Sequence, residues 1–310
     1  MKRVRIATRG SALALAQAGG VARALEAALG CETELVKVVT TGDRLAEVSL
    51  ARLGGKGLFV KEIEEALLDG RADLAVHSAK DLPARVHPGL VLAAFPPRAD
   101  PRDALVGRHA GAKLAALPPR ARVGTGSARR ASQLHALRPD VEVVALRGNV
   151  DTRLRRLVER ELDAVLLACA GLERLGRTEV IHERIDPAVL LPAVGQGTLA
   201  LQTRAGDGLE RALDALDDPL ARACLAAERA FLVGLEGDCN VPLAALAEPG
   251  ADGRLRLRAL VASLDGAQVA RSEQWAPLAQ AESAGRRAAE QVLAGGGAEI
   301  LACLRAEMSR

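Results

Sequence analysis

The sequence predicts an α/β fold of two doubly wound lobes in succession, followed by a small α+β domain with an antiparallel sheet. Three observations lead to this prediction. In the N-terminal third, short apolar runs alternate with longer runs of helical period, which is typical of parallel sheets covered by helices. The same alternation begins again after the proline-rich stretch 96–101. Near the C-terminus, residues 254–258 alternate between arginine and leucine, which is the pattern of an antiparallel strand.

The first lobe is predicted from a β-α-β pattern at the N-terminus. Residues 4–8 form a strand-like run, residues 11–29 are rich in alanine and leucine at helical spacing, and residues 34–39 return to a strand. After a glycine-rich loop, residues 59–68 again have helical spacing, and residues 73–77 have the apolar character of a buried strand. We therefore expect a parallel sheet with covering helices here.

The second lobe repeats this order after the prolines. A strand at 122–123 runs through the turn 124–127 into a helix over 128–137. Further strands are expected over 141–146 and 164–168, separated by a helix over 151–160.

The C-terminal part differs in character. Residues 198–202 are predicted to return as a strand, and residues 219–232 are strongly helical. The Asp-Gly pairs at 252–253 and 265–266 are hairpin turn signals, and a last helix is expected over 278–293. We therefore assign residues 1–97 and 198–216 to domain 1, residues 98–197 to domain 2 and residues 217–310 to domain 3.

Composition excludes several classes of protein. The 42 Lys and Arg residues are interleaved with 39 Asp and Glu, so the net charge is only +3, and aromatic residues make up 1% of the chain. Without a basic stripe or stacking aromatic side chains, nucleic acid is not an expected partner. The five cysteines include no CxxC pair and the histidines form no HExxH motif, so neither a disulfide framework nor a metal site is predicted.

No stretch of the sequence predicts a membrane partner. No apolar run approaches the roughly 20 residues that span a bilayer. The N-terminus faintly resembles a secretory signal, but Arg5 and Arg9 interrupt an apolar stretch that is already too short. We therefore expect a mature N-terminus and a cytoplasmic protein.

Cations gather where predicted strands end and helices begin. Ligands of open α/β sheets bind beyond the carboxyl ends of the strands, close to helix N-termini, so such cations address one shared anion. Each like-charge pair costs on the order of 2 kcal/mol at about 8 Å and an effective dielectric near 20, so stability alone does not explain the cluster. Guanidinium groups bind carboxylates in pairs, which predicts a polycarboxylate or phosphate ligand. The cations are Arg9, Arg129, Arg130, Arg147 and Arg153.

Two of these arginines carry a further constraint. Arg129 and Arg130 fall in the first turn of a predicted helix, where a cation opposes the helix dipole unless an anion intervenes. The alternative is that each arginine is a surface residue with an acidic neighbour of its own.

Asp81 is the carboxylate of a junction otherwise occupied by cations. It follows a buried-type strand and Lys80, and it precedes Leu82-Pro83. An ionised aspartate there could stabilise a cationic intermediate or pass a proton to a leaving group. It could equally cap a turn, and the spacing leaves both roles open.

Two glycine-rich loops and one cysteine complete the candidate motifs. The loop 54–57 lacks the Walker spacing, and the loop 124–127 lacks the acidic residue that a dinucleotide site requires, so nucleotide binding is not predicted. Cys239 lies in a tight turn, where a lone cysteine is most often a small buried hydrophobic residue.

Taken together, these stretches resemble the porphobilinogen deaminase family, whose members are also called hydroxymethylbilane synthases. The resemblance implies three domains, of which the first two are like a bilobed periplasmic binding protein. It also implies a dipyrromethane cofactor held by a thioether to a cysteine of the third domain, here Cys239. The matching segments are 7–11, 54–61, 75–83, 123–130, 146–153, 170–176, 191–197 and 235–242.

The resemblance also implies the reaction. Four porphobilinogen molecules are joined head to tail with release of ammonia, and the linear tetrapyrrole hydroxymethylbilane is then released by hydrolysis. Such an enzyme is a monomeric transferase of tetrapyrrole biosynthesis. Asp81 matches the catalytic aspartate, whose carboxylate would stabilise the azafulvenium cation that forms as ammonia leaves.

Other site residues follow from the same resemblance, residue by residue. The cofactor-binding positions are Cys239, Lys80, Ser127, Arg129, Arg130, Arg147, Arg153 and Gly171. The substrate-binding positions are Arg9, Ser11, Arg147, Arg153, Arg174 and Gln196. Arg52, Lys56 and Phe59 would form a lid. The chain departs from the family pattern at Ala79, Gly126, Asp238 and Asn240.

Two rival functions remain to be compared. A non-catalytic bilobed receptor for a small dicarboxylate would explain the two lobes and the cations. It would give no role to Asp81 or Cys239 and would leave the third domain unexplained. An NAD-dependent enzyme would need the dinucleotide fingerprint that the loops lack.

Overall fold

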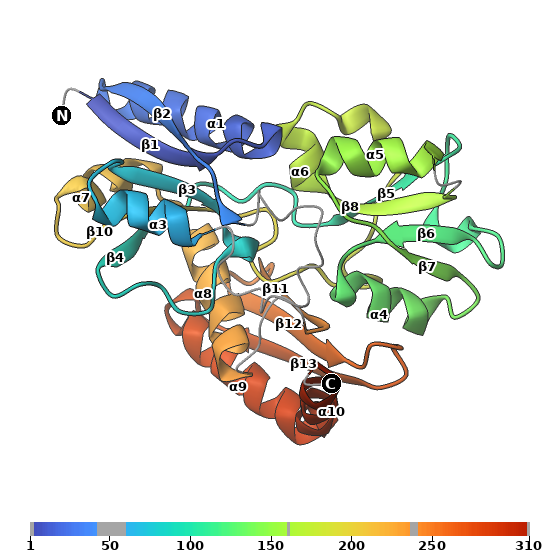
Figure 1. The fold of residues 1–310 in the computed structure, drawn as a ribbon. Coiled ribbons are helices and arrows are strands. Elements are labelled where there is room, and N and C mark those ends of the chain that lie inside the picture. Colours follow the sequence, from blue (N-terminus) through green and yellow to red (C-terminus); the bar gives the residue numbers. More distant parts are fainter. Residues whose placement is uncertain (1–2, 42–59, 160–161, 236–240, 309–310) are drawn as a thin grey trace. The chain divides into compact units, whose positions relative to one another are not determined.

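The computed structural model describes residues 3–41, 60–159, 162–235 and 241–308 (Figure 1). The chain divides into two units, residues 1–99 with 197–222 and residues 100–196 with 223–310. The first unit contains one five-stranded sheet, and the second contains a five-stranded and a three-stranded sheet. The predicted fold class is confirmed, whereas the three domain boundaries stay a prediction.

The sheet of the first unit has the strand order β2-β1-β3-β10-β4. β1 runs parallel to β2 and β3, whereas β10 runs antiparallel to both of its neighbours. Residues of α1 pack on one face of the sheet and residues of α3 on the other. The elements are β1 (Arg3–Arg9), α1 (Ala12–Leu29), β2 (Glu32–Val38), α3 (Lys61–Leu68), β3 (Leu74–Ser78), β4 (Leu90–Ala94), β10 (Leu199–Arg204) and α7 (Leu209–Leu213).

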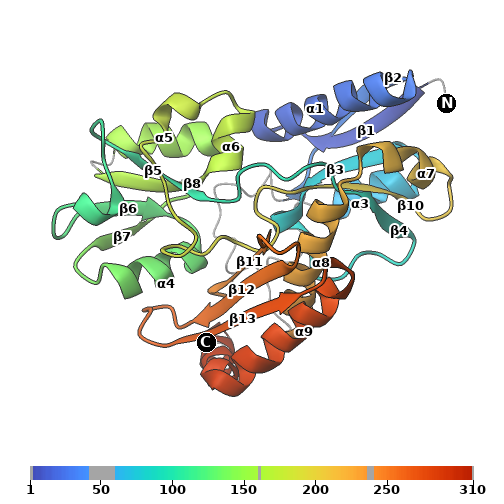
Figure 2. The ribbon, with the colours of Figure 1, turned by 180° about the vertical axis from the view of Figure 1, so that it is seen from behind.

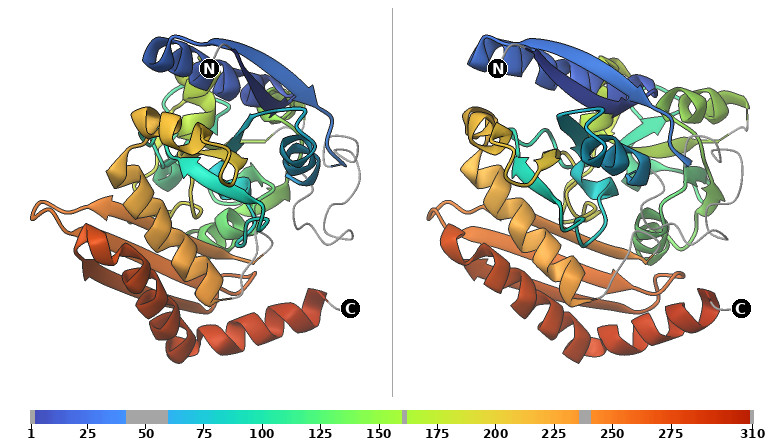
Figure 3. Two further views of the ribbon diagram at one scale, coloured as in Figure 1. Left: turned by 90° about the vertical axis from the view of Figure 1, so that its left-hand side faces the viewer. Right: turned by 60° about the vertical axis from the view of Figure 1, so that its left-hand side comes forward.

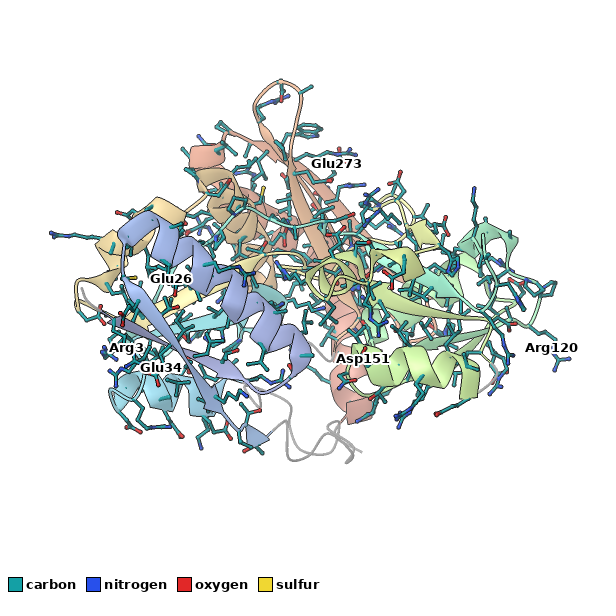
Figure 4. The ribbon with its side chains drawn as sticks, turned by 90° about the horizontal axis from the view of Figure 1, so that it is seen from above. Arg3, Glu26, Glu34, Arg120, Asp151 and Glu273 are labelled. Carbon is teal, nitrogen blue, oxygen red and sulfur yellow. The ribbon has the colours of Figure 1, made fainter. Side chains whose placement is uncertain are left out.

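Helix α1 has clear start and stop signals. The Ser11 hydroxyl accepts a hydrogen bond from the Ala14 amide at 3.3 Å, and Gly30 ends the helix at a φ of 60°. Arg3 of β1 and Glu34 of the neighbouring β2, both labelled in Figure 4, form an ion pair with 3.0 Å between Nη2 and Oε2.

The five-stranded sheet of the second unit repeats the same arrangement in the order β7-β6-β8-β5-β9. Parallel β7, β6 and β8 stand beside an antiparallel β5. α4 packs on one face, while α5 and α6 pack on the other (Figure 2). The elements are β5 (Asp103–Gly107), β6 (Arg122–Thr125), α4 (Ala128–Leu137), β7 (Glu142–Ala145), α5 (Val150–Glu159), β8 (Ala164–Ala168), α6 (Cys169–Arg174) and β9 (Glu183–Arg184).

The C-terminal part is an antiparallel meander with helices, as its alternating pattern predicts. β12 lies between β11 and β13. α9 packs against β12 and β13 and touches α8 at Gly285 (Figure 3). The elements are α8 (Pro219–Gly234), β11 (Leu243–Pro249), β12 (Leu255–Ala262), β13 (Val269–Ala276), α9 (Ala281–Val292) and α10 (Ala298–Met308). Among the helices described, none combines the length and apolar character that a membrane span requires.

Candidate active site

In the first unit, the predicted site residues gather at one edge of the sheet. Arg9 ends β1, and Ser11 caps α1 immediately after it. Lys80 and Asp81 lie in the 3₁₀ turn η2 (Ala79–Asp81), which directly follows β3. Because β1 and β3 are adjacent and parallel, their carboxyl ends meet at the same edge. The structure therefore brings these four residues to one side of one sheet, as expected for a ligand site of this fold.

A chain of side chains supports the strand that leads to Asp81. The buried His77 ring of β3 donates from Nε2 to Gln202 Oε1 of β10 at 2.8 Å, and Gln202 Nε2 donates to Glu64 Oε1 of α3 at 2.8 Å. These contacts tie two strands and a helix together just before η2. Burial lowers the pKa of His77 to about 4, although the hydrogen bond to Gln202 opposes that shift.

The depressed pKa of His77 predicts an acid-sensitive fold. Because the unfolded chain binds the proton near pH 6.5 and the native chain only near 4, stability is complete above pH 6.5 and falls as the pH drops toward 4. His77 alone should remove about 2 kcal/mol of unfolding free energy between about pH 7 and 5. Urea titrations at both pH values should show this loss reduced in His77→Gln but retained in the exposed control His87→Gln. Equal pH dependence in the two variants would contradict the assignment.

In the second unit, two loops at the carboxyl edge of the sheet touch each other. Ser127 caps α4 by accepting from the Arg130 amide at 3.4 Å. A Cβ added at Gly126 would collide with the carbonyl oxygen of Leu146, which follows β7. The departure of Gly126 from the family pattern therefore has a physical reason, since only glycine lets the β6–α4 loop lie this close to the next strand end.

Arg129 and Arg130 are buried, with 4% and 5% of their surfaces exposed, and both bind Asp103 of β5. Arg129 Nη1 lies 2.7 Å from Asp103 Oδ2, and Arg130 Nη2 lies 2.7 Å from Oδ1. The anion that the start of α4 requires is thus supplied by the chain itself. Burial raises the pKa of Asp103, but the two arginines more than offset this and hold it well below its usual range.

The loop after β7 is held by its own arginines. Arg153 Nε donates to the Gly148 carbonyl at 2.8 Å, and Arg156 Nη1 donates to the Arg147 carbonyl at 3.1 Å. Gly148 has a φ of 105°, which glycine adopts without strain. Asp151, labelled in Figure 4, pairs with Arg177 at 3.0 Å. Hydrogen bonds within the loop therefore fix the positions of Arg147 and Arg153.

The remaining candidates differ in their surroundings. Gly171 and Arg174 lie on α6, which follows β8 and so begins at the same edge. Burial lowers the pKa of Arg174, whereas the neighbouring Glu173 raises it. Gln196 is only 1% exposed, and its Nε2 donates to the Pro101 carbonyl at 2.7 Å and to Asp103 at 2.9 Å. Its amide nitrogen is therefore already engaged within the second unit.

Asp103 is the site residue that our sequence reasoning missed. A carboxylate directly before the apolar run 104–106 was the available signal, because a charge at the start of a buried strand needs a buried partner. Several predicted residues lie outside the described ranges. These are Cys239 with Asp238 and Asn240, and Arg52, Lys56 and Phe59. In the described ranges, no group of histidine, cysteine and acidic side chains could hold a metal ion.

The chain is an α/β protein with two similar sheets, and cationic side chains follow the carboxyl ends of strands in each sheet. Residues 4–211 match the family described as "Porphobilinogen deaminase, dipyromethane cofactor binding domain", and residues 222–294 match "Porphobilinogen deaminase, C-terminal domain". The chain belongs to the porphobilinogen deaminase family.

Curated relatives are similar over nearly their whole length. The chain is 49% identical to the porphobilinogen deaminase of Syntrophobacter fumaroxidans over 300 residues, which are 96% of each chain. It is 51% identical to that of Roseiflexus castenholzii over 299 residues, which are 96% of this chain and 98% of the relative. Among solved structures, the methionine binding protein MetQ is 12% identical with a TM-score of 0.41, and the match covers 69% of this chain and 88% of that one.

Proposed function

We propose that this chain is a porphobilinogen deaminase, a transferase of tetrapyrrole biosynthesis that acts in the cytoplasm as a monomer. It joins four porphobilinogen molecules head to tail, releases one ammonia at each condensation, and hydrolyses the product to hydroxymethylbilane. The observation that carries the proposal is the family match over both parts of the chain, together with the cations and Asp81 at the strand ends.

The residues present fit the acidic dipyrromethane cofactor of the family. Each pyrrole ring of such a cofactor bears an acetate and a propionate. The buried Arg129–Arg130 pair meets a single carboxylate, that of Asp103, and Arg129 Nε is buried without a hydrogen-bond partner among the described residues. When bound, the cofactor supplies the primer to which the substrate units are joined. The residues proposed to hold it are Cys239, through a thioether, with Lys80, Ser127, Arg129, Arg130, Arg147, Arg153 and Gly171.

In this proposal the chain's own residues divide the work. Arg9, Ser11, Arg147, Arg153, Arg174 and Gln196 are assigned to the substrate. Guanidinium groups and helix starts orient its acetate and propionate groups. Asp81 is placed against the substrate carbon that loses ammonia, where its carboxylate stabilises the cation that develops on the pyrrole. The turn η2 suits this role, since a buried strand anchored by His77 precedes it.

Intact mass spectrometry tests this function directly. The purified chain is expected to be heavier than its polypeptide by two linked pyrroles and to give the colour reaction of dipyrromethanes. Cys239→Ser should remove the added mass, whereas Cys303→Ser, a change at an exposed cysteine, should keep it. A bare polypeptide mass with tight binding of a dicarboxylate would favour the receptor instead.

A further inference from the structure

Asp103 makes an unusual set of contacts for a structural aspartate. Its side chain is fully buried, and its Oδ1 accepts from Arg129 Nη2 at 3.2 Å, from Arg130 Nε at 3.0 Å and from Arg130 Nη2 at 2.7 Å. Gln196 Nε2 adds a further donor at 2.9 Å. Both guanidinium planes are therefore fixed by one carboxylate, and a neutral amide fixes that carboxylate in turn.

The charge of this cluster is not balanced. Two guanidinium groups face one carboxylate, and of the described charges that act on Arg129, Asp103 attracts and Arg130 repels. A comparable cluster in the first unit is balanced, since Arg5 and Arg204 there meet Asp73 and Asp207. A buried excess of one positive charge is costly in a folded protein, so stability alone does not explain the second arginine.

An unsatisfied hydrogen-bond donor in the cluster is a second indication that stability alone does not explain it. Arg129 is 4% exposed, and its Nη1 is shared between Asp103 and the Leu191 carbonyl, each at 2.7 Å. Its Nε is buried and has no hydrogen-bond partner among the described residues. A buried donor left unsatisfied is destabilising, and an incoming carboxylate would satisfy both the donor and the excess charge.

We propose that Asp103 is a positioning residue for the arginine pair. It holds Arg129 and Arg130 aligned before the acidic ligand arrives, so that binding costs little reorganisation. Gln196 acts with it by orienting Oδ1, a role that this buried glutamine has in addition to the substrate contact proposed for it. The inference rests on the proposed function, because the ligand in question is the dipyrromethane carried by the chain.

The test compares two aspartates that each bridge two arginines. Asp103→Asn and the control Asp73→Asn are expressed as full chains, folded protein is isolated by size exclusion, and the fraction carrying the two-pyrrole mass is measured. Loss of charge-assisted hydrogen bonds that align the pair should lower the loaded fraction at least about tenfold in Asp103→Asn. Asp73→Asn should load as the wild type does, whatever the urea midpoints of the two variants.

A purely neutralising role for Asp103 predicts a different result. If Asp103 only neutralises charge, Asp103→Asn would leave a more positive site and would load as well as the wild type or better, which overturns the inference. If Asp103→Asn does not fold, Gln196→Met is measured in its place, because it keeps every charge of the cluster. A fall in the loaded fraction that is smaller than about tenfold supports the inference, and a normal loaded fraction overturns it. A wild type without added mass would instead overturn the proposed function and, with it, this inference.

Discussion

Asp81→Asn is expected to bind pyrroles and keep its cofactor but to turn over porphobilinogen at least about a hundredfold more slowly. Asparagine keeps the size of the side chain and removes the charge that opposes the developing cation. Asp81 is exposed at the end of η2, so the change should leave the fold intact. The loss should therefore fall on the chemical step rather than on folding.

The measurement is the rate of ammonia release, with intact mass and the urea midpoint recorded on the same samples. Asp69→Asn is a suitable control, because Asp69 is also exposed in the first unit and follows α3 on another part of the surface. Near-normal turnover in Asp81→Asn would refute the catalytic assignment. Loss of the cofactor mass in that variant would instead move Asp81 to the binding residues.

Gly285→Ala is expected to destabilise the second unit by about 3 kcal/mol, although alanine normally favours a helix. An added Cβ would collide with the Ala227 carbonyl oxygen and would lie 2.6 Å from Ala230 Cβ and 2.9 Å from the Phe231 amide. Two of these are backbone atoms of α8, so α9 would have to move away from α8 as a whole.

Gly20→Ala is the matched control, because Gly20 lies inside α1 and, apart from the adjacent backbone of that helix, no described heavy atom lies within 4 Å of the added Cβ. It should raise stability by about 1 kcal/mol through helix propensity alone. Urea unfolding curves of both variants give the comparison. An unchanged midpoint for Gly285→Ala would mean that the contact between α8 and α9 is looser than the structure has it.

Much of the fold could be predicted because local signals agree with it. α4 spans Ala128–Leu137 as its period predicts, and α1 ends where Gly30 stands. The strand β5 was missed because prolines precede it and a charged residue opens it, so that the stretch has the character of a domain boundary. β11 was missed too, since its alanine-rich run has neither alternation nor strong strand propensity.

The candidate site could be predicted only in part. The strand-end positions of Arg9 and Asp81 in the first sheet, and of Arg147 in the second, follow from sequence order, because parallel strands bring their carboxyl ends to the same edge of their own sheet. The partner of Arg129 could not be found this way. Asp103 lies on β5, which pairs antiparallel with β8, a strand about 60 residues later in the chain. Pairing between strands that are distant in sequence leaves little local signal in the sequence.

The place of β10 has a consequence for synthesis in the cell. It stands between β3 and β4, yet it begins at Leu199 whereas β4 ends at Ala94. At translation speeds of about 5–20 residues per second, the ribosome takes several seconds to deliver it, and β3 and β4 have open edges meanwhile. Nascent chains stalled in that interval should depend on chaperones to avoid aggregation.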